Sequence, residues 1–563
     1  MLFIAVSLAA VFGTSDALAQ KPKHTFTRSY WDFESKYPRS EGWYYADEYL
    51  GNTTLEQGTW KYWDRIGNLE EERVYEKGVL QGRVTLFHPN GKKKQEGFFA
   101  NNEMDSVYTE WYDNGKVSVK GEYDMGHPTG KWNYFYDNGY HKMEEEIIDT
   151  VSYVWNFWRS DSLQTLKEGN GKTVMYYSHG YLETFYEYKN GLKDGDFEEY
   201  SVRGRQMVAG HYTQGRKTGN WLYSYYTGGP DRQLTYVDDK IDGPYRKYYD
   251  NGKLNIRGNY TMGKKTGTWT WFTNEGGKDM EGLFLDDAQE GLWTYWFPED
   301  STTVSQRGYF DQGKRHGKWD FFYANGKAWK IGEYKNDLED GAWKTWYENG
   351  KLLKEGQFLA GKETGEWKNY YDNGDLKNLG NFDAGQLHGE WQSFFKKGKI
   401  HLLGKYDHDL KTGEWIRYSD KSRPLEAGSY KIITIEKNVD YGPFADRKIL
   451  ESVKDGKWVW FSEKDGNKTH EGEYNSGKES GTWTYFHQGG LVPFRTVEYK
   501  DGKINGMMRE YGFRPHYVIY EVTYKDGLRD GKMTVYDQNG KVLSEKTYSE
   551  GMETWSDGKP KTY

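Results

Sequence analysis

Histidine, aspartate, glutamate and cysteine are the side chains most able to do chemistry, and in this 563-residue chain they form no recognisable catalytic pattern. The 13 histidines are scattered, and there is no His-Glu-x-x-His motif, phosphate-binding loop or Gly-x-Ser-x-Gly turn. Asp-Asn-Gly-Lys turns resemble calcium loops but lack the acidic ligands that should follow. The sequence predicts a protein that is not an enzyme and holds no cofactor or metal. Carboxylates brought together from neighbouring repeats stay open as an alternative.

Aromatic side chains offer binding chemistry instead. They make up 18% of the chain, although all hydrophobic residues together make up only 36%. Tryptophan, tyrosine and phenylalanine favour β-strands, and their rings can stack on sugars. Acidic and basic residues are nearly balanced, 85 against 77. This balance provides no basic surface for a nucleic acid, so we expect no nucleic-acid partner.

A period of about 24 residues organises most of the chain. A glycine that precedes an aromatic residue by two positions recurs at steps of 24, with one step of 26, from Gly195 to Gly413. From Gly456 to Gly531 the step is 25. With this glycine numbered zero, +2 is mostly tryptophan, +8 and +9 are often Asn-Gly, and +15 and +17 are often glycine and an aromatic residue. Position +5 is aromatic in every repeat but one, where Ser224 stands. Such a period indicates a repeat protein.

Each repeat is predicted to be a β-hairpin. Asn-Gly at +8 and +9 suits a type I′ turn between two strands, and the glycine at +20 marks a second turn into the next hairpin. One hairpin alone is marginally stable in water, so stability must come from stacked neighbours. We therefore expect an all-β fold, an elongated and solenoid-like antiparallel meander of about twenty stacked hairpin repeats of 24–25 residues each.

Two aromatic ladders could form the core. Positions +2 and +5 face opposite sides of a regular strand unless a bulge turns one of them. We expect +2 and +17 to form the buried side, which leaves +5 as a second packed face or as a binding face. The candidate binding-face aromatics are Tyr248, Phe272, Trp296, Phe322, Trp346 and Tyr370.

The interruptions of the period predict the organisation of the chain. Residues 20–57 are expected to be an N-terminal cap, and residues 58–430 to be hairpin repeats with a degenerate repeat near 148–170. Residues 431–455 are an insertion, either functional or neutral loop growth. Residues 456–563 hold further repeats and a C-terminal cap.

Residues 1–19 resemble a secretory signal peptide. The stretch from Leu2 to Phe12 is almost entirely apolar, and Ala17-Leu18-Ala19 is a small-x-small cleavage site, although no basic residue comes first. A buried N-terminal segment is the alternative. The chain has no cysteine, which excludes a lipid anchor on cysteine, and no apolar stretch is long enough for a transmembrane helix. We expect an exported protein, periplasmic or extracellular, without a lipid anchor.

Repeats such as Gly341-Ala-Trp343-Lys-Thr-Trp346-Tyr347-Glu-Asn349-Gly350 resemble the MORN-repeat variant family of bacteria, which includes proteins labelled as YwqK-type antitoxins. The resemblance covers roughly residues 58 to 555. It implies an elongated stack of β-hairpins and, through related MORN repeats, a scaffold for protein or lipid contacts.

Three functions are compatible with these features, and membrane contact through the aromatic edge is a further alternative that no basic patch supports. The first is an exported scaffold for protein–protein interaction in the cell envelope, with a protein partner. The second is an antitoxin or immunity protein of the YwqK type, which the family label implies. The third is a glycan-binding surface that uses an exposed +5 ladder.

Overall fold

The computed structural model describes residues 24–47, 53–438 and 446–555, and every regular element in these ranges is a β-strand. No helix there is long and apolar enough to cross a membrane. The predicted signal peptide, residues 1–19, lies outside the described residues, as do parts of the predicted caps and insertion. The chain divides into two compact units, residues 1–264 and 265–563.

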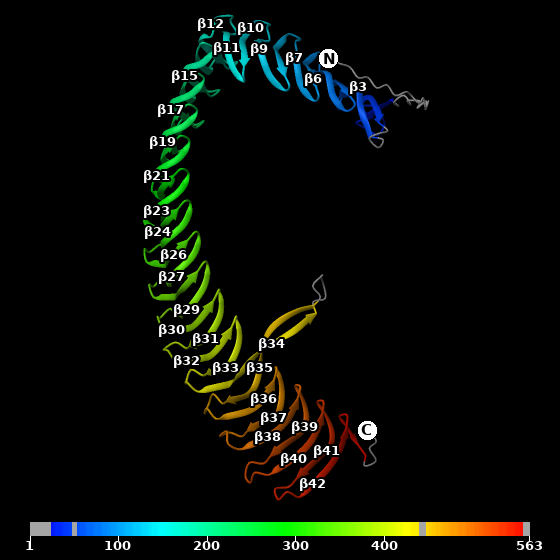
Figure 1. Cartoon of the computed structure of the whole chain (residues 1–563), viewed down its shortest axis with the longest axis vertical. Coiled ribbons are helices and arrows are strands. Elements are labelled where there is room, and N and C mark those ends of the chain that lie inside the picture. The colour runs from blue at the N-terminus through cyan, green and yellow to red at the C-terminus, as the bar shows by residue number, and fades with distance from the viewer. Residues whose placement is uncertain (1–23, 48–52, 439–445, 556–563) are drawn as a thin grey trace, which may run out of the picture. The chain divides into compact units, whose positions relative to one another are not determined.

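Within each unit, successive strands pair antiparallel with their neighbours in the chain, and the hairpins follow one another in a row (Figure 1). This arrangement confirms the predicted all-β meander. The strands of the first unit are β1 (His24–Tyr30), β2 (Pro38–Asp47), β3 (Thr53–Trp63), β4 (Leu69–Glu76), β5 (Val79–Phe87), β6 (Lys93–Ala100), β7 (Glu103–Trp111), β8 (Val117–Asp124), β9 (His127–Phe135), β10 (His141–Ile148), β11 (Val151–Trp158), β12 (Gln164–Lys167), β13 (Asn170–Tyr176), β14 (Leu182–Lys189), β15 (Leu192–Tyr200), β16 (Gln206–Thr213), β17 (Arg216–Ser224), β18 (Pro230–Val237), β19 (Lys240–Tyr248) and β20 (Leu254–Thr261).

The strands that follow are β21 (Lys264–Phe272), β22 (Lys278–Leu285), β23 (Ala288–Phe297), β24 (Asp300–Asp311), β25 (Lys314–Phe322), β26 (Ala328–Lys335), β27 (Leu338–Trp346), β28 (Leu352–Leu359), β29 (Lys362–Tyr370), β30 (Leu376–Asp383), β31 (Gln386–Phe394), β32 (Ile400–Asp407), β33 (Leu410–Tyr418), β34 (Pro424–Asn438), β35 (Asp446–Phe461), β36 (Lys468–Asn475), β37 (Lys478–Phe486), β38 (Pro493–Lys500), β39 (Lys503–Tyr511), β40 (Val518–Lys525), β41 (Leu528–Tyr536), β42 (Val542–Ser549) and β43 (Met552–Thr554).

The Asn-Gly turn is not of type I′, so that prediction was wrong. In the repeat that starts at Gly341, Gly350 has a φ of 90°, whereas Asn349 does not have a positive φ. The Gly350 N–H donates to the Tyr347 carbonyl, and the Tyr347 N–H donates to the Lys351 carbonyl, both at 2.8 Å. These bonds define a three-residue loop in which a type I turn is followed by a left-handed glycine. Asn349 keeps its negative φ because its side chain accepts the Lys351 N–H at 2.9 Å, in the manner of an Asx turn.

The type I′ turn lies at the opposite edge, at positions +19 and +20. Ala360 and Gly361 have φ values of 50° and 80°, and Leu359 pairs directly with Lys362. The same two-residue geometry recurs in other repeats, for example at Asn336 and Asp337. Each repeat therefore alternates two different turns, one at each edge of the sheet.

Hydrogen bonds between repeats tie the Asn-Gly edge together. The Tyr347 hydroxyl donates to the Tyr370 carbonyl of the next repeat at 2.9 Å. Lys351 Nζ donates to the Asn373 carbonyl at 2.6 Å. The equivalent +6 tyrosine hydroxyl makes the same bond from Tyr112, Tyr136, Tyr177, Tyr225, Tyr323 and Tyr371. These bonds satisfy carbonyl groups that would otherwise end each strand unpaired.

Each +2 tryptophan lies over the +15 glycine of the preceding repeat. A Cβ atom on Gly356 would stand 2.0 Å from Cδ2 of Trp367, which is far inside van der Waals contact. The indole nitrogen of Trp367 donates to the Gln357 carbonyl beside that glycine at 3.1 Å. The same contact joins the pairs Gly42/Trp60, Gly121/Trp132, Gly210/Trp221, Gly282/Trp293, Gly308/Trp319, Gly332/Trp343, Gly404/Trp415, Gly428/Trp458 and Gly472/Trp483. The glycine at +15 is thus a packing requirement, since only a residue without a Cβ lets the indole lie on the strand.

The +17 aromatics fill the spaces between the indoles. Tyr334 and Trp343 meet at 5.1 Å and 88°, Trp343 and Phe358 at 5.9 Å and 82°, and Phe358 and Trp367 at 5.0 Å and 81°. Such edge-to-face pairs are favourable beyond the area they bury. Trp343 and Trp367 are only 2% and 3% exposed. The +2 and +17 ladder is therefore the core, as predicted, and we call this side of the sheet the tryptophan face.

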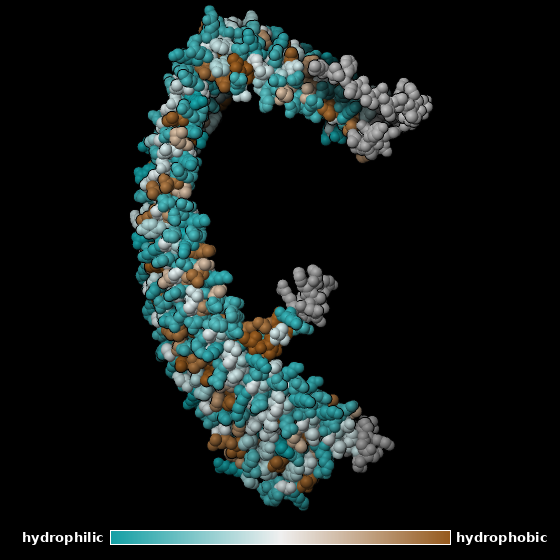
Figure 2. All heavy atoms as spheres, in the orientation of Figure 1, coloured by the Kyte–Doolittle hydropathy of each residue, from teal (hydrophilic) through white to brown (hydrophobic). Residues whose placement is uncertain are grey.

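Two interruptions change the hairpins without ending the row. Residues 151–167 form the short hairpin β11–β12, in which Phe157 and Leu166 are completely buried. The second interruption is the predicted insertion that begins at Lys431. There β34 and β35 extend as one long hairpin, in which Lys431 pairs with Val453 and the last described pair is Asn438 with Asp446. This arm lengthens the type I′ edge, and Figure 2 shows hydrophobic residues gathered on it. Leu450 on the arm is 60% exposed.

The indole-on-glycine contact can be tested by giving the glycine a methyl group. Gly356→Ala should lower the free energy of unfolding of the neighbouring hairpins by about 1–3 kcal/mol, the usual cost of overpacking. Its φ is not positive, so the cost comes from the indole rather than from the backbone. Thermal unfolding and hydrogen exchange in β28 and β29 would measure it. Gln357→Ala, at the adjacent exposed position, is the control. An equal effect of the two variants would contradict the assignment.

Candidate binding groove

The side of the sheet opposite the tryptophans, here called the polar face, carries positions +1, +3, +5, +14 and +16. Lys344 at +3 pairs with Glu355 at +14, and Ala342 at +1 pairs with Gln357 at +16. Lys344 Nζ and a Glu355 carboxylate oxygen lie 3.0 Å apart. Strand alternation therefore separates a closed apolar side from an open polar side.

The six candidate aromatics at +5 all lie half-buried on strands of the polar face. Lys278 Nζ lies 5.2 Å from the Trp296 ring, and the Arg307 guanidinium lies 5.6 Å from the Phe322 ring. Tyr248 donates its hydroxyl to Gln233 Oε1 at 3.1 Å. Phe272 and Trp346 share this half-buried environment.

Tyr370 shows how the +5 ring is held. Its hydroxyl donates to Glu355 Oε1 of the preceding repeat at 2.7 Å. Burial and this hydrogen bond raise the pKa of Tyr370 to about 12, and the same bond lowers the pKa of the Glu355 carboxyl. The hydroxyl therefore stays protonated and donating at neutral pH. The +5 ladder links repeats on the polar face, and its use in ligand binding stays a prediction.

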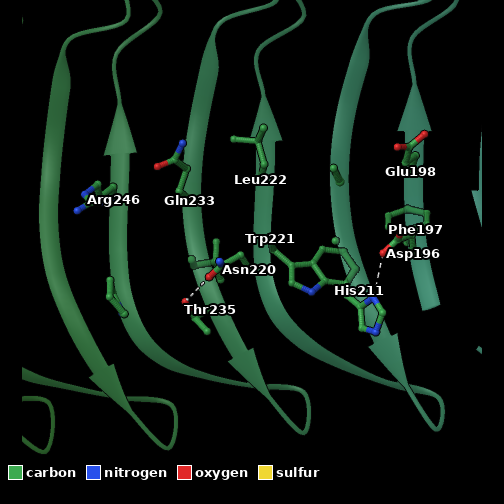
Figure 3. Close-up of a pocket in the computed structure, with 14 residues that line it drawn as sticks. Asp196, Phe197, Glu198, His211, Asn220, Trp221, Leu222, Gln233, Thr235 and Arg246 are labelled. Atoms are coloured by element: carbon green, nitrogen blue, oxygen red, sulfur yellow. Dashed lines mark hydrogen bonds and ion pairs between the residues drawn. The ribbon is translucent and has the colours of Figure 1, made fainter. Parts of the chain in front are cut away.

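A groove of about 540 Å³ crosses the polar face over β15 to β19 in the first unit (Figure 3). One row of paired residues runs along it, directly opposite one another on five successive strands: Glu198, Ala209, Leu222, Gln233 and Arg246. Five strands span four inter-strand steps, or roughly 19 Å. The row thus begins with an acid, passes an apolar centre and ends with a guanidinium.

A short side chain lines the centre of this groove. Ala209 occupies position +14, where Glu355 stands in the later repeat, and its methyl group sits between Glu198 and Leu222. Ser224, the one +5 residue that is not aromatic, belongs to the next repeat. The centre of this row therefore carries a methyl group where other repeats, such as that of Glu355, carry a long side chain.

Polar side chains border the groove in a second row. His211 Nδ1 and Asp196 Oδ1 are 2.9 Å apart, and Thr235 donates its hydroxyl to Asn220 Oδ1 at 3.0 Å, as the dashed lines of Figure 3 show. Asp196 and Glu198 make one end acidic. Arg246 at the other end has no carboxylate within ion-pair distance among the described residues. The groove is therefore dipolar.

Smaller or differently charged hollows recur at equivalent positions of the polar face. One of about 550 Å³ lies over β9 to β11, where Glu144, Glu146 and, from the turn after β12, Glu168 line it. Another of about 300 Å³ lies over β27 to β29, between Lys344 and Lys368. The sequence did not identify the groove residues, although Ser224, the exception in the +5 ladder, ends one of the strands that carry the groove.

The fold and this site define a class, a repeat protein whose hairpins bury one face and leave the other open. The model of the MORN repeat variant family matches this chain at residues 80–101, 104–125, 241–261, 315–336, 339–360, 363–384 and 529–550. These hairpins are MORN repeats of the variant type, which confirms the resemblance seen in the sequence. The narrower YwqK-type label stays a prediction.

No curated protein matches the sequence. Among solved structures, the chain is similar to the crystal structure of TcdB2-TccC3, at 12% identity, with a TM-score of 0.12, over 95% of this chain and 32% of that one. A Photorhabdus luminescens Tc holotoxin pore is similar at 11% identity, with a TM-score of 0.12, over 95% and 31%. The chain thus spans about a third of the length of these structures, and such weak similarity supports no functional argument.

The unequal roles of the two ladders can be measured in one repeat. Trp343→Ala should cost about 3–5 kcal/mol because it removes a fully buried indole. Trp346→Ala should cost clearly less, because that ring is only half-buried. Chemical denaturation followed by far-UV circular dichroism and hydrogen exchange of β27 would compare them. A loss at Trp346 as large as that at Trp343 would mean that the polar face is also a core.

Proposed function

We propose that this chain is a non-enzymatic, exported scaffold that binds a segment of a protein partner on its polar face. The observation that carries the proposal is the dipolar groove over β15 to β19, with Glu198 and Arg246 at opposite ends of one row. The MORN repeats support a scaffold that binds.

The dimensions of the groove favour a polypeptide segment. An extended chain advances about 3.3 Å per residue, so about six residues would cover the roughly 19 Å between the two charged ends. The segment would carry a basic side chain near Asp196 and Glu198, an apolar one near Leu222 and an acidic one near Arg246. Opposite charges at two ends fix both the register and the direction of such a segment.

The polar groups of the groove are already engaged in ways that suit binding rather than catalysis. His211 pairs with Asp196, while the Thr235 hydroxyl donates to Asn220 rather than to an imidazole. A nucleophile needs a base within hydrogen-bond reach, and Thr235 lacks that arrangement. Export rests on the sequence of residues 1–19 and is tested by following the full chain through periplasmic and medium fractions.

A glycan ligand is the second candidate, supported by the half-buried +5 rings beside acidic and amide side chains. This candidate predicts that soluble oligosaccharides bind the full chain and that Trp346→Ala weakens their binding. Binding of a protein partner would instead depend on Arg246 and Ala209. An antitoxin role would require a linked toxin whose effect this chain relieves on co-expression.

Site-specific crosslinking tests the protein partner. With p-benzoylphenylalanine in place of Leu222, irradiation of cells should give one discrete crosslinked protein. Arg246→Glu should reduce that product about tenfold, because it places an acid opposite an acidic partner side chain. Arg203→Glu, which reverses an exposed arginine outside the groove, should leave it unchanged.

A second pair of variants tests the hollow itself. Ala209→Leu should prevent formation of the crosslinked product, because the larger side chain fills the groove. Ala427→Leu, the same change at position +14 of a repeat outside the groove, should leave the crosslinked product unchanged. No discrete product from Leu222, or equal losses in the test and control variants, would overturn the proposal.

A further inference from the structure

A cluster of two histidines and an aspartate lies on the type I′ edge of the second unit. His388 Nδ1 is 3.2 Å from Asp407 Oδ1, and His408 Nδ1 is 2.6 Å from the same oxygen. The imidazole centroids are 4.9 Å apart. One ligating atom from each residue lies within 4.8 Å of those of the other two. Both rings therefore point their nitrogens at one carboxylate.

The fold brings these residues together across 20 positions of sequence. His388 stands at position −1 on β31, while Asp407 ends β32 and His408, with a φ of 47°, is the first residue of the turn that follows. The backbone around them is fixed, because the Leu387 N–H donates to Asp409 Oδ1 at 2.8 Å and the Asp409 N–H donates to the Leu387 carbonyl at 2.9 Å. The three side chains thus project from a braced turn.

The same positions do something different elsewhere in the array. In other repeats the −1 side chain accepts the backbone N–H of +19, as Gln81 accepts Asn101 at 2.9 Å and Asp340 accepts Ala360 at 3.3 Å. In this repeat the −1 side chain is an imidazole, and it faces Asp407. The cluster is therefore not a version of the usual turn cap.

From this geometry we propose that His388, Asp407 and His408 form a binding site for a divalent transition metal such as Zn²⁺. Two imidazole nitrogens and one carboxylate oxygen are ligands that Zn²⁺ accepts, at bond lengths of about 2.0–2.2 Å. Tetrahedral ligands at that distance are separated by about 3.3–3.5 Å, so small rotations of half-exposed side chains suffice. Water completes the coordination, since the side chains are 48%, 48% and 52% exposed. Nitrogen donors disfavour Ca²⁺ and Mg²⁺.

Calorimetric titration of the full chain with Zn²⁺, after removal of any histidine tag and of bound metal, tests the site. We expect one saturable equivalent that Mg²⁺ and Ca²⁺ do not displace. His388→Ala, His408→Ala and Asp407→Asn should each weaken it at least tenfold. His141→Ala, which removes the imidazole of a His–Glu pair that lacks a second histidine and does not line the groove, is the matched control and should change nothing.

Cobalt substitution gives an independent measurement. Co²⁺ bound by these three residues should produce visible absorption that the His388→Ala/His408→Ala double variant loses while its circular dichroism spectrum stays that of the parent chain. The proposal is overturned if no saturable Zn²⁺ binding occurs, or if the double variant binds Zn²⁺ and Co²⁺ as the parent does.

Discussion

The contact between the indole of each repeat and the glycine of the repeat before it sets the geometry on which the array depends. A tryptophan can lie flat on a strand only where the strand has no Cβ, and Gly356 under Trp367 shows how little room there is. The contact fixes the distance and the register between neighbouring hairpins together. Because the indole nitrogen of Trp367 also bonds to the adjacent Gln357 carbonyl, this large side chain is buried with its donor satisfied.

This packing closes one face of the sheet. The two edges and the opposite face do not form the core, so their residues can vary. The Asn-Gly edge is tied from repeat to repeat through Tyr347 and Lys351. The type I′ edge accepts additions, and β34 and β35 extend there while their inner parts stay in register with their neighbours. The polar face varies in side-chain size and charge, so its hollows differ from repeat to repeat, while the histidine cluster lies on the type I′ edge.

The sequence predicted what the period determines. Spacing alone indicated the hairpins and the buried +2 and +17 ladder, because strand alternation and repeat length leave few other arrangements. It misplaced the type I′ turn, since the dipeptide Asn-Gly suits two turn types and the side-chain bond of Asn349 decides between them. It missed the groove, because only the strand register shows which side chains lie side by side, such as Ala209 between Glu198 and Leu222. It also missed the proximity of His388 to His408, which requires the register of β31 and β32. The half-burial of Trp346 depends on neighbours a full repeat away.

The repeated indole-on-glycine join has a genetic consequence. Junctions that keep both the tryptophan and the glycine are built alike, so a recombination event that adds or removes 24 codons in frame between two of them re-forms the same contact. Such events would lengthen or shorten the coding sequence without disturbing the core. They would, however, change how many repeats separate the groove at Leu222 from the arm of β34 and β35. The gene can thus alter the order and spacing of surface features by unequal crossing-over, independently of point mutation in any single repeat.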